Sequence, residues 1–394
     1  MSYIRIAAAL TALCLASPAQ AVTSSSAYQG NAAHDGRLSM SGGFLPPLHQ
    51  IWSRDLGGAQ NAYVGYPVVA NGLAFVTVSN ADDQVTRLYA LDLQTGKTVW
   101  MKPMHGPFSW STLAYDNGRL FVQNEDGVVK AFEANRKGKI AWVTRFGGTP
   151  AEIIAANGHV FISANLIVGS LSEKDGHVEW SRPVNGSASS PAADDVGVYV
   201  GYPCQYYEFD QATGDTLWHN SGNCSGGGDA NPVYYDHQVF VRDWATHNWV
   251  LDANTGKKTG QIFPADQSFA IWPQPSGQPA LIVTSRPSGE TAFLKSIDLA
   301  SGNVNWSFKP DVNDSLDAAP LVLNDMVVVG SNHGKLYLLD AATGAKLWSA
   351  DVGAAMLSDG TGRGGNSERL RESFGAGDDV LLVPATNLLV AYKP

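Results

Sequence analysis

Three things are scarce in this sequence of 394 residues: cysteines, charged residues, and long apolar runs after the first 21 residues. There are 3 cysteines, and they form neither an adjacent pair nor a Cys-x-x-Cys-His haem attachment motif. No later segment approaches the roughly 18 uninterrupted apolar residues of a membrane-spanning helix. We therefore expect no membrane span and no attached haem.

Basic residues are also few. Lysine and arginine total 26 against 36 aspartates and glutamates, which gives a formal net charge of −10. An acidic surface repels phosphate backbones, and no basic cluster interrupts it. Nucleic acid is therefore not an expected partner.

The N-terminus has the pattern of an export signal. Arg5 precedes an apolar stretch over residues 6–16, and Ala19-Gln20-Ala21 forms a small-x-small cleavage pattern. We predict a signal peptide over residues 1–21 and a periplasmic or secreted protein. Cys14 lies inside this peptide and follows Leu13, whereas a lipidated cysteine normally follows a small residue.

Two cysteines remain after the predicted signal peptide, Cys204 and Cys224. Disulfides persist in exported proteins. The two cysteines lie twenty residues apart, within one copy of the sequence repeat described below. Each falls in a connection between strands, and we expect both connections on the same side of the molecule. We predict a structural disulfide between them.

The sequence contains one motif that is repeated along its length: an apolar run, then Asp-x-x-Thr-Gly, then three residues and a Trp. The turn glycines are Gly96, Gly138, Gly176, Gly214, Gly256, Gly302 and Gly344, at spacings of 42, 38, 38, 42, 46 and 42 residues. A period near forty residues with strands and tight turns is typical of a four-stranded propeller blade. Departures occur at Ala134 and Ser172, where Asp is expected, and near Ile262, where Trp is expected.

The two ends of the chain supply one further blade. Residues 49–56, with Trp52, resemble a fourth strand without its first three, and residues 379–392 resemble inner strands without a fourth. Joining them closes the ring without an exposed sheet edge. We predict an all-β, eight-bladed propeller of four-stranded antiparallel blades over residues 49–394, preceded by a lead-in segment, residues 22–48, that is wrapped across the ring or disordered.

Residues 90–100 match Ala-x-Asp-x-x-Thr-Gly-x-x-x-Trp throughout, and residues 210–218, 298–306 and 340–348 match its core. The chain thereby resembles the pyrroloquinoline quinone (PQQ)-like β-propeller repeat family. The resemblance implies either a quinoprotein dehydrogenase, with PQQ and usually Ca²⁺, or a non-enzymatic propeller similar to BamB that binds protein partners. The cysteines, twenty residues apart, differ from the adjacent pair of the alcohol-oxidising enzymes, and this chain is far shorter than theirs.

Residues just before each inner strand should surround one mouth of the central channel. We expect this ring to contain Tyr66, Trp110, Glu152, Ser190, Asn231, Trp272, Asp317 and Glu372. Aromatics and carboxylates together suit a sugar, a peptide segment or a small organic ligand. The alternative is that these residues have a structural role only and pack against the loops.

Two further segments could bind ligands. The glycine-rich segment 223–231 offers Asp229, Asn231 and carbonyl oxygens to Ca²⁺. The connection 353–377 carries Arg369 and Arg371, which could bind a carboxylate or phosphate. A plain glycine-rich loop and a short solvated helix explain the same residues.

These observations favour an exported binding protein, a monomer, that holds a protein or carbohydrate ligand through its loop face and channel. No cofactor is expected. The alternative is an enzyme at the channel mouth, either a PQQ-dependent dehydrogenase with Ca²⁺ or a carbohydrate-active propeller.

Overall fold

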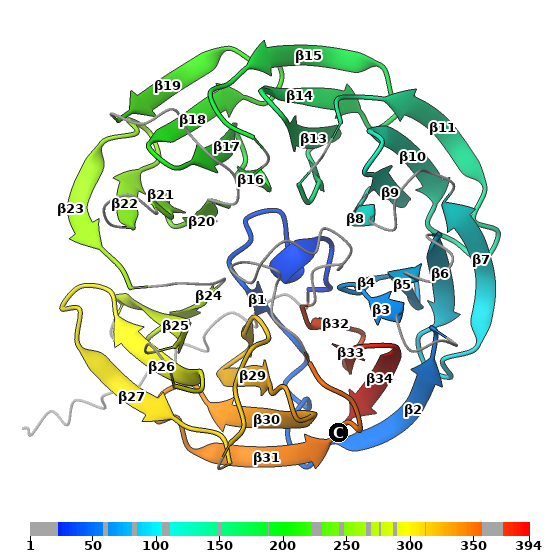
Figure 1. Ribbon diagram of the computed structural model, residues 1–394, viewed down its shortest axis with the longest axis vertical. Helices are drawn as coiled ribbons and strands as arrows, with labels where there is room; N and C mark the ends of the chain where they lie inside the picture. Colours follow the sequence, from blue (N-terminus) through cyan, green and yellow to red (C-terminus); the bar gives the residue numbers. More distant parts are fainter. Residues whose placement is uncertain are drawn as a thin grey trace, which may run out of the picture.

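The computed structural model describes residues 23–57, 62–80, 85–104, 111–148, 151–187, 189–222, 231–243, 248–264, 269–275, 277–286, 290–311, 313–356 and 373–394. Within them the chain forms eight sheets arranged as blades around a central axis (Figure 1). The only helix described is the 3₁₀ turn η1 (Tyr28–Gly30). The predicted eight-bladed propeller is confirmed. The predicted signal peptide lies outside the described residues.

The first four blades follow the lead-in and β2 in chain order. Blade 1 contains β3 (Ala62–Val64), β4 (Val68–Ala70), β5 (Leu73–Asn80), β6 (Thr86–Asp92) and β7 (Thr98–Met104). Blade 2 contains β8 (Ser111–Asp116), β9 (Arg119–Asn124), β10 (Val128–Glu133) and β11 (Ile140–Arg145). Blade 3 contains β12 (Ile154–Ala156), β13 (His159–Ala164), β14 (Ile167–Ser172) and β15 (Val178–Pro183). Blade 4 contains β16 (Ala192–Ala193), β17 (Gly197–Tyr202), β18 (Gln205–Asp210) and β19 (Thr216–Ser221).

The remaining blades complete the ring. Blade 5 contains β20 (Val233–Tyr235), β21 (Gln238–Val241), β22 (Trp249–Asp252) and β23 (Lys258–Ile262). Blade 6 contains β24 (Phe269–Pro273), β25 (Pro279–Ser285), β26 (Phe293–Asp298) and β27 (Val304–Phe308). Blade 7 contains β28 (Leu321–Leu323), β29 (Met326–Gly330), β30 (Lys335–Asp340) and β31 (Lys346–Asp351), with the lead-in strand β1 (Arg37–Leu38) added in parallel to β28.

Blade 8 is assembled from both ends of the chain. It contains β32 (Gly375–Gly377), β33 (Val380–Ala385) and β34 (Leu388–Lys393), and its outer strand is β2 (His49–Asp55). β2 pairs antiparallel with β34, with Trp52 opposite Ala391. The predicted closure is therefore confirmed, and this blade has no unpaired outer edge at β34.

The repeated Trp and Gly join neighbouring blades. Trp180 on β15 donates from its indole Nε1 to the carbonyl of Gln211, in the outer turn of blade 4, at 2.7 Å. The indole also lies against Gly214, where an added Cβ would be 2.4 Å from Trp180 Cδ2. The equivalent indole bond, 2.7 to 2.9 Å long, is made by Trp52, Trp100, Trp142, Trp218 and Trp306. Each Trp thus fills the wedge between two blades and satisfies a turn carbonyl of the next one.

The turn residues of the repeat hold the turn through side-chain hydrogen bonds. In blade 1 the Asp92 carboxylate accepts hydrogen bonds from the Thr95 amide at 3.2 Å and the Thr95 hydroxyl at 2.9 Å. Where blade 2 has Ala134 in place of Asp, Asn135 accepts from Lys137 N at 2.8 Å instead. In each copy whose hydrogen bonds are described, the turn motif therefore has a structural role.

Blade 5 lacks the tryptophan, as the sequence indicates. Ile262 ends β23 and is 54% exposed, while Phe263 is buried and packs on Phe240 and Phe269 with ring centroids 5.6 and 5.2 Å apart. Four residues after Gly256, where the other copies have tryptophan, the chain has Gly260, and no atom lies within 4 Å of its added Cβ. Phe263 therefore packs near the wedge without replacing the indole. Gly302, the turn glycine of the next blade, has no atom within 4 Å of an added Cβ.

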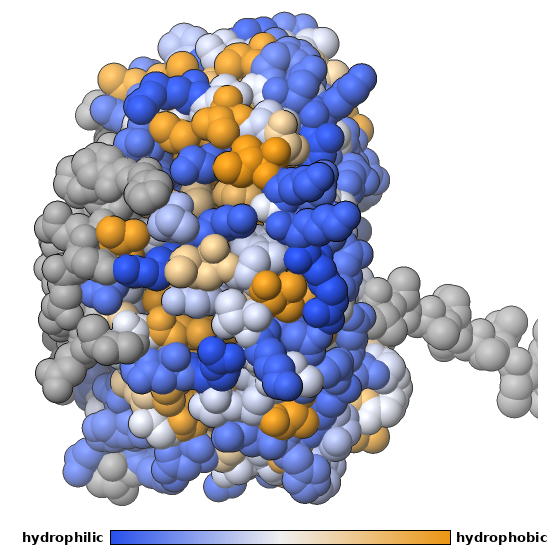
Figure 2. Space-filling view, turned by 90° about the vertical axis from the view of Figure 1, so that its right-hand side faces the viewer, coloured by the Kyte–Doolittle hydropathy of each residue, from blue (hydrophilic) through white to orange (hydrophobic). Residues whose placement is uncertain are grey.

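The rim of the ring is mixed in character. Figure 2 shows hydrophobic residues in small separate groups among hydrophilic ones on the side of blades 1 and 2. Exposed Met101, Ile140 and Val143 belong to the outer strands there. In the part of the chain that the structure describes, no helix is long and apolar enough to cross a membrane.

Candidate functional site

The blade topology gives the channel two different ends. Hairpins joining the first to the second and the third to the fourth strand of each blade lie on one side, here called the turn face. Connections from the second to the third strand, and from the fourth strand to the next blade, lie on the other side, here called the loop face. Nearly all departures from the repeat length fall in loop-face connections.

The lead-in segment occupies the turn-face end of the channel, where η1 and β1 lie inside the ring of inner strands (Figure 1). Backbone amides of the inner strands donate to lead-in carbonyls: Val69 to Ser25, Tyr115 to Ser26, Ala193 to Ala32, Tyr234 to Ala33, Ile271 to Asp35 and Val322 to Gly36, at 2.7 to 3.0 Å. The lead-in thus satisfies inner-edge amides of six blades. The turn-face end of the channel is filled by the protein itself.

The loop-face end of the channel is surrounded by polar side chains. At or just before the inner strands lie Ser111, Glu152, Ser190, Asn231, Asp317 and Ser373, here called the polar collar. All except Asp317 are buried, with 0 to 6% exposure. Buried polar groups require hydrogen-bond partners, so the collar must form contacts across blade boundaries.

One chain of hydrogen bonds joins blades 3, 4 and 5. The Ser190 hydroxyl donates to Glu152 Oε2, and the Ser190 amide donates to Asn231 Oδ1 at 2.8 Å. Glu152 N in turn donates to Ser190 Oγ at 3.2 Å. The Asn231 Nδ2 group has no hydrogen-bond partner among the described residues. This chain fixes the starts of three inner strands and leaves an amide donor at the channel end.

A second collar contact joins blades 6 and 7. Arg286, which follows β25, donates from Nη2 to Asp317 Oδ1. Ser315 Oγ donates to the same Asp317 oxygen at 3.3 Å and accepts from Ala292 N at 2.9 Å. The side chains of Arg286 and Asp317 retain 25% and 14% exposure. Asp317 is therefore held by an ion pair.

The other described residues of the predicted ring take different places. Tyr66 is buried, and its hydroxyl donates to Leu113 O at 2.8 Å and accepts from Leu113 N at 2.9 Å. It joins the inner strands of blades 1 and 2. Trp272 lies within β24 near its turn-face end, where its Nε1 donates to Asp325 Oδ1 at 3.1 Å. Trp272 therefore does not belong to the loop-face mouth.

Several predicted residues lie outside the described residues: Trp110, Cys224, Asp229, Arg369, Arg371 and Glu372. Ser111 and Ser373 follow two of them directly and occupy collar positions. No repeated motif marks these serines, so sequence reasoning missed them. Cys204 is described in the turn between β17 and β18 and is buried. Its pairing with Cys224 stays a prediction.

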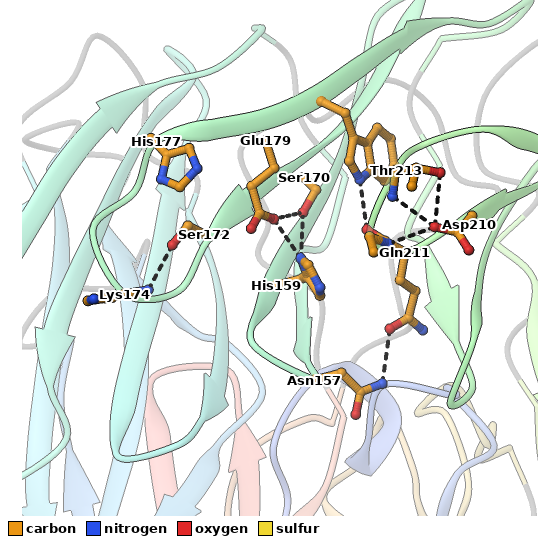
Figure 3. Close-up of polar contacts among 12 residues, drawn as sticks. Asn157, His159, Ser170, Ser172, Lys174, His177, Glu179, Asp210, Gln211 and Thr213 are labelled. Atoms are coloured by element: carbon orange, nitrogen blue, oxygen red, sulfur yellow. Dashed lines mark hydrogen bonds and ion pairs between the residues drawn. The ribbon is translucent and has the colours of Figure 1, made fainter.

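Blade 3 contains a serine, a histidine and a carboxylate in contact (Figure 3). Ser170 Oγ donates to Glu179 Oε2 at 2.7 Å and lies 3.3 Å from His159 Nδ1, and the same Nδ1 contacts Glu179. A catalytic triad needs the serine and the acid on opposite ring nitrogens, so that the histidine can accept a proton while the acid orients it. Here both contact one nitrogen, so the cluster is structural.

Comparison with known proteins agrees with the repeat analysis. A sequence profile of the family described as outer membrane protein assembly factor BamB matches residues 49–188, 164–293 and 290–393. The BamB of Moranella endobia is 21% identical over 351 residues, 78% of this chain and 84% of that protein. The match therefore covers nearly all of the propeller.

Enzymes share parts of the same pattern. Tetrathionate hydrolase of Acidithiobacillus ferrooxidans is 29% identical over 200 residues, 43% of this chain, and the match spans only 39% of the hydrolase's length. The solved structure of a europium-containing methanol dehydrogenase superposes with a TM-score of 0.67 at 14% identity, covering 85% of this chain and 86% of that one. Such low identity shows a common fold alone. With the profile matched across all eight blades, this chain belongs to the family described as outer membrane protein assembly factor BamB.

Proposed function

We propose that this protein is an exported binding protein of the cell envelope, and that it engages a partner through the loop face around the polar collar. The observation that carries the proposal is the division of the channel. The lead-in fills the turn-face end of the channel. The loop-face end is lined by the buried polar collar, which lies below the connections that differ in length from blade to blade. Binding residues are concentrated on loops held by a rigid scaffold.

The collar supports this role by holding the loops in place. Glu152, Ser190 and Asn231 tie three blades together at the points where their loop-face connections enter the inner strands. Asp317 and Arg286 do the same between blades 6 and 7. A surface with fixed loop ends loses less conformational entropy on binding than a mobile one.

Membership of the BamB family favours a protein over a carbohydrate as the partner. The family's name describes the assembly of outer membrane proteins, and an envelope location would agree with the signal peptide predicted over residues 1–21 and with a Cys204–Cys224 disulfide. We propose both features together with the location.

A PQQ-dependent enzyme is the alternative, because the fold is shared with methanol dehydrogenase. PQQ carries three carboxylates and needs cationic surroundings. The charged side chains described at the loop end include Arg242 and Arg286, together with the acids Glu152, Asp243, Asp314 and Asp317. Arg286 is already paired with Asp317, and an end of the channel with more acids than arginines does not suit a tricarboxylate. Among the described residues, no three His, Cys, Asp or Glu side chains are placed to hold a metal ion.

Photo-crosslinking tests the proposed face. A photoreactive amino acid is placed at His333 on the loop face, whose side chain is 63% exposed, and as a matched control at exposed Lys97 on the turn face of blade 1. We expect a protein crosslink in envelope extract from position 333 and none from position 97. Equal crosslinking from both positions, or none, contradicts the proposal.

A second measurement tests the alternative that the protein is a PQQ-dependent enzyme. Purified protein is mixed with PQQ and Ca²⁺, and reduction of a dye is followed with alcohols and aldoses. Binding of PQQ and turnover of a defined substrate would replace the binding-protein proposal. No binding and no reduction would remove the dehydrogenase alternative.

A further inference from the structure

A pocket of about 760 Å³ opens on the turn face between the lead-in and blades 3, 4 and 5. Asn31 and Ala33 of the lead-in form one side, and Asn157 and Asp194 from inner hairpins form others. Its volume is within the range of roughly 300 to 1,000 Å³ found for small-ligand sites. It is here called the turn-face pocket, and it lies at the opposite end of the channel from the polar collar.

One wall of the turn-face pocket is aromatic and fixed in position. The rings of Tyr199 and Tyr234 stack with centroids 5.5 Å apart and an interplanar angle of 7°. The Tyr199 hydroxyl donates to Asp194 Oδ2 at 2.9 Å. The Asp194 Oδ1 atom accepts the amides of Val196 and Gly197 at 2.8 and 2.6 Å. The wall is therefore held rigidly before any ligand arrives.

Carboxylates without a cationic partner line the same pocket. Among the described residues, Asp194, Asp195 and Glu208 form no salt bridge with lysine or arginine. Glu208 is only 5% exposed. Burial, with a smaller contribution from the charge of Asp194, raises the pKa of Glu208 to about 7. Glu208 is therefore about half protonated near pH 7 in the empty pocket, and a cation bound beside it would favour its ionised form.

The pocket suits an organic cation rather than a metal ion. In the described part of the chain, no three acidic, histidine or cysteine side chains converge on one point. Ca²⁺ takes about six to eight oxygen ligands, which separated carboxylates do not provide. Flat aromatic faces beside carboxylates recognise ammonium and guanidinium groups.

The rim of the pocket indicates the size of the ligand. Val196 and Leu217 line the pocket and are 60% and 49% exposed. These apolar side chains extend the site beyond the cavity toward solvent. A lysine or arginine side chain has an aliphatic stem that covers such a surface while its charged end enters the acidic interior, and the flanking peptide would cover the rim.

We propose that the turn-face pocket binds a lysine or arginine side chain presented by an extended segment of a partner protein. The charged end lies between Asp195 and Glu208, and the stem packs on Leu217 and the Tyr234 ring. This site is independent of the loop face, so either assignment can fail without the other.

The test is a titration of the protein without residues 1–21, the predicted signal peptide, at about 0.15 M salt so that long-range attraction is screened. The probes are a fluorescent heptapeptide of glycine and serine with a central arginine or lysine, and the same peptide with a central glutamine. We expect the basic peptides to bind at least tenfold more tightly than the glutamine peptide.

Matched variants locate the site. Asp195→Asn and Glu208→Gln, each alone, should weaken the basic peptide about tenfold, with a thermal midpoint that is unchanged for Asp195→Asn and not lowered for Glu208→Gln. Glu290→Gln, an exposed acid on the loop face, removes the same charge elsewhere and should leave binding unchanged. An equal effect of Glu290→Gln, undiminished binding in both pocket variants, or equal affinity for the glutamine peptide overturns the proposal. Equal affinity for free butylamine overturns the peptide assignment.

Discussion

The contact between Trp180 and Gly214 permits a quantitative test of what holds the blades together. Gly214 has a φ of +69°, and an added Cβ would lie 2.4 Å from Trp180 Cδ2. Gly302 occupies the same turn position in blade 6 with a φ of +70°, yet no atom lies within 4 Å of its added Cβ, because blade 5 lacks the tryptophan. The two glycines therefore share a backbone conformation and differ in their surroundings.

Gly302→Ala should incur only the backbone penalty of a left-handed residue, about 1 to 2 kcal/mol. Gly214→Ala should incur the same penalty plus that of forcing a methyl group into the indole, about 1 to 3 kcal/mol for an overpacked contact. We expect Gly214→Ala to lower the free energy of unfolding by about 2 to 5 kcal/mol. The difference between the two variants isolates the contact between blades.

Urea denaturation followed by tryptophan fluorescence and by far-UV circular dichroism measures both variants, and agreement of the two signals checks that unfolding is cooperative. A double-mutant cycle completes the test. In a Trp180→Leu background, which removes the indole, the penalty of Gly214→Ala should fall to that of Gly302→Ala. If the two alanine variants are equally destabilised, or if the penalty persists without the indole, the reasoning is wrong.

Three further predictions concern polar groups. Tyr66→Phe removes the hydroxyl that bonds both backbone groups of Leu113 and should lower the free energy of unfolding by about 1 to 3 kcal/mol; a urea midpoint equal to that of the wild type contradicts this. Ser190→Ala leaves the Glu152 carboxylate without its hydroxyl donor and should destabilise by a similar amount of about 1 to 3 kcal/mol, with a thermal melt as the measurement. Because the folded pKa of Glu208 is about 7 against 4.5 in the unfolded chain, the folded state loses stability as pH rises from 4.5 to 7. Glu208→Gln should therefore gain about 1 to 2 kcal/mol over the wild type between pH 5 and pH 8, after allowance for solvent screening; parallel pH profiles would refute this.

The fold was predictable because the residues that determine it recur. The turn Gly recurs in every copy and is followed four residues later by Trp in all copies except that of blade 5. Trp180 and Gly214 show the wedge contact and the turn that these residues form. Trp52 identified the closing strand by the same pattern, although it lies far in sequence from Ala391, its partner across β2 and β34.

The path of the lead-in could not be predicted. Its contacts with the inner strands are mainly between backbone atoms, as in the bond from Val322 N to Gly36 O at 2.7 Å. Such bonds leave no side-chain pattern in the sequence. The sequence left both a wrapped segment and a disordered one open.

The candidate site was predictable only in outline. Glu152, Asn231 and Asp317 were expected at the channel mouth from their position before inner strands, and they do lie at its loop end. Trp272 was expected there too, but β24 begins three residues earlier, at Phe269, and carries the indole toward the other face. The turn-face pocket had no sequence signal, because Glu208 and Tyr199 face each other only through strand register.

The bond between Ser25 N and Ala376 O joins residues that lie 351 positions apart in the chain. Residues of the lead-in are synthesised first, yet their acceptors and donors on blades 7 and 8 are synthesised last. The lead-in therefore lacks its partners on blades 7 and 8 until those blades have been synthesised. The lead-in can complete its contacts, and the ring can close, only once the last strands are present. A chain delivered across a membrane from its N-terminus would have to remain incompletely folded until its last strand emerged.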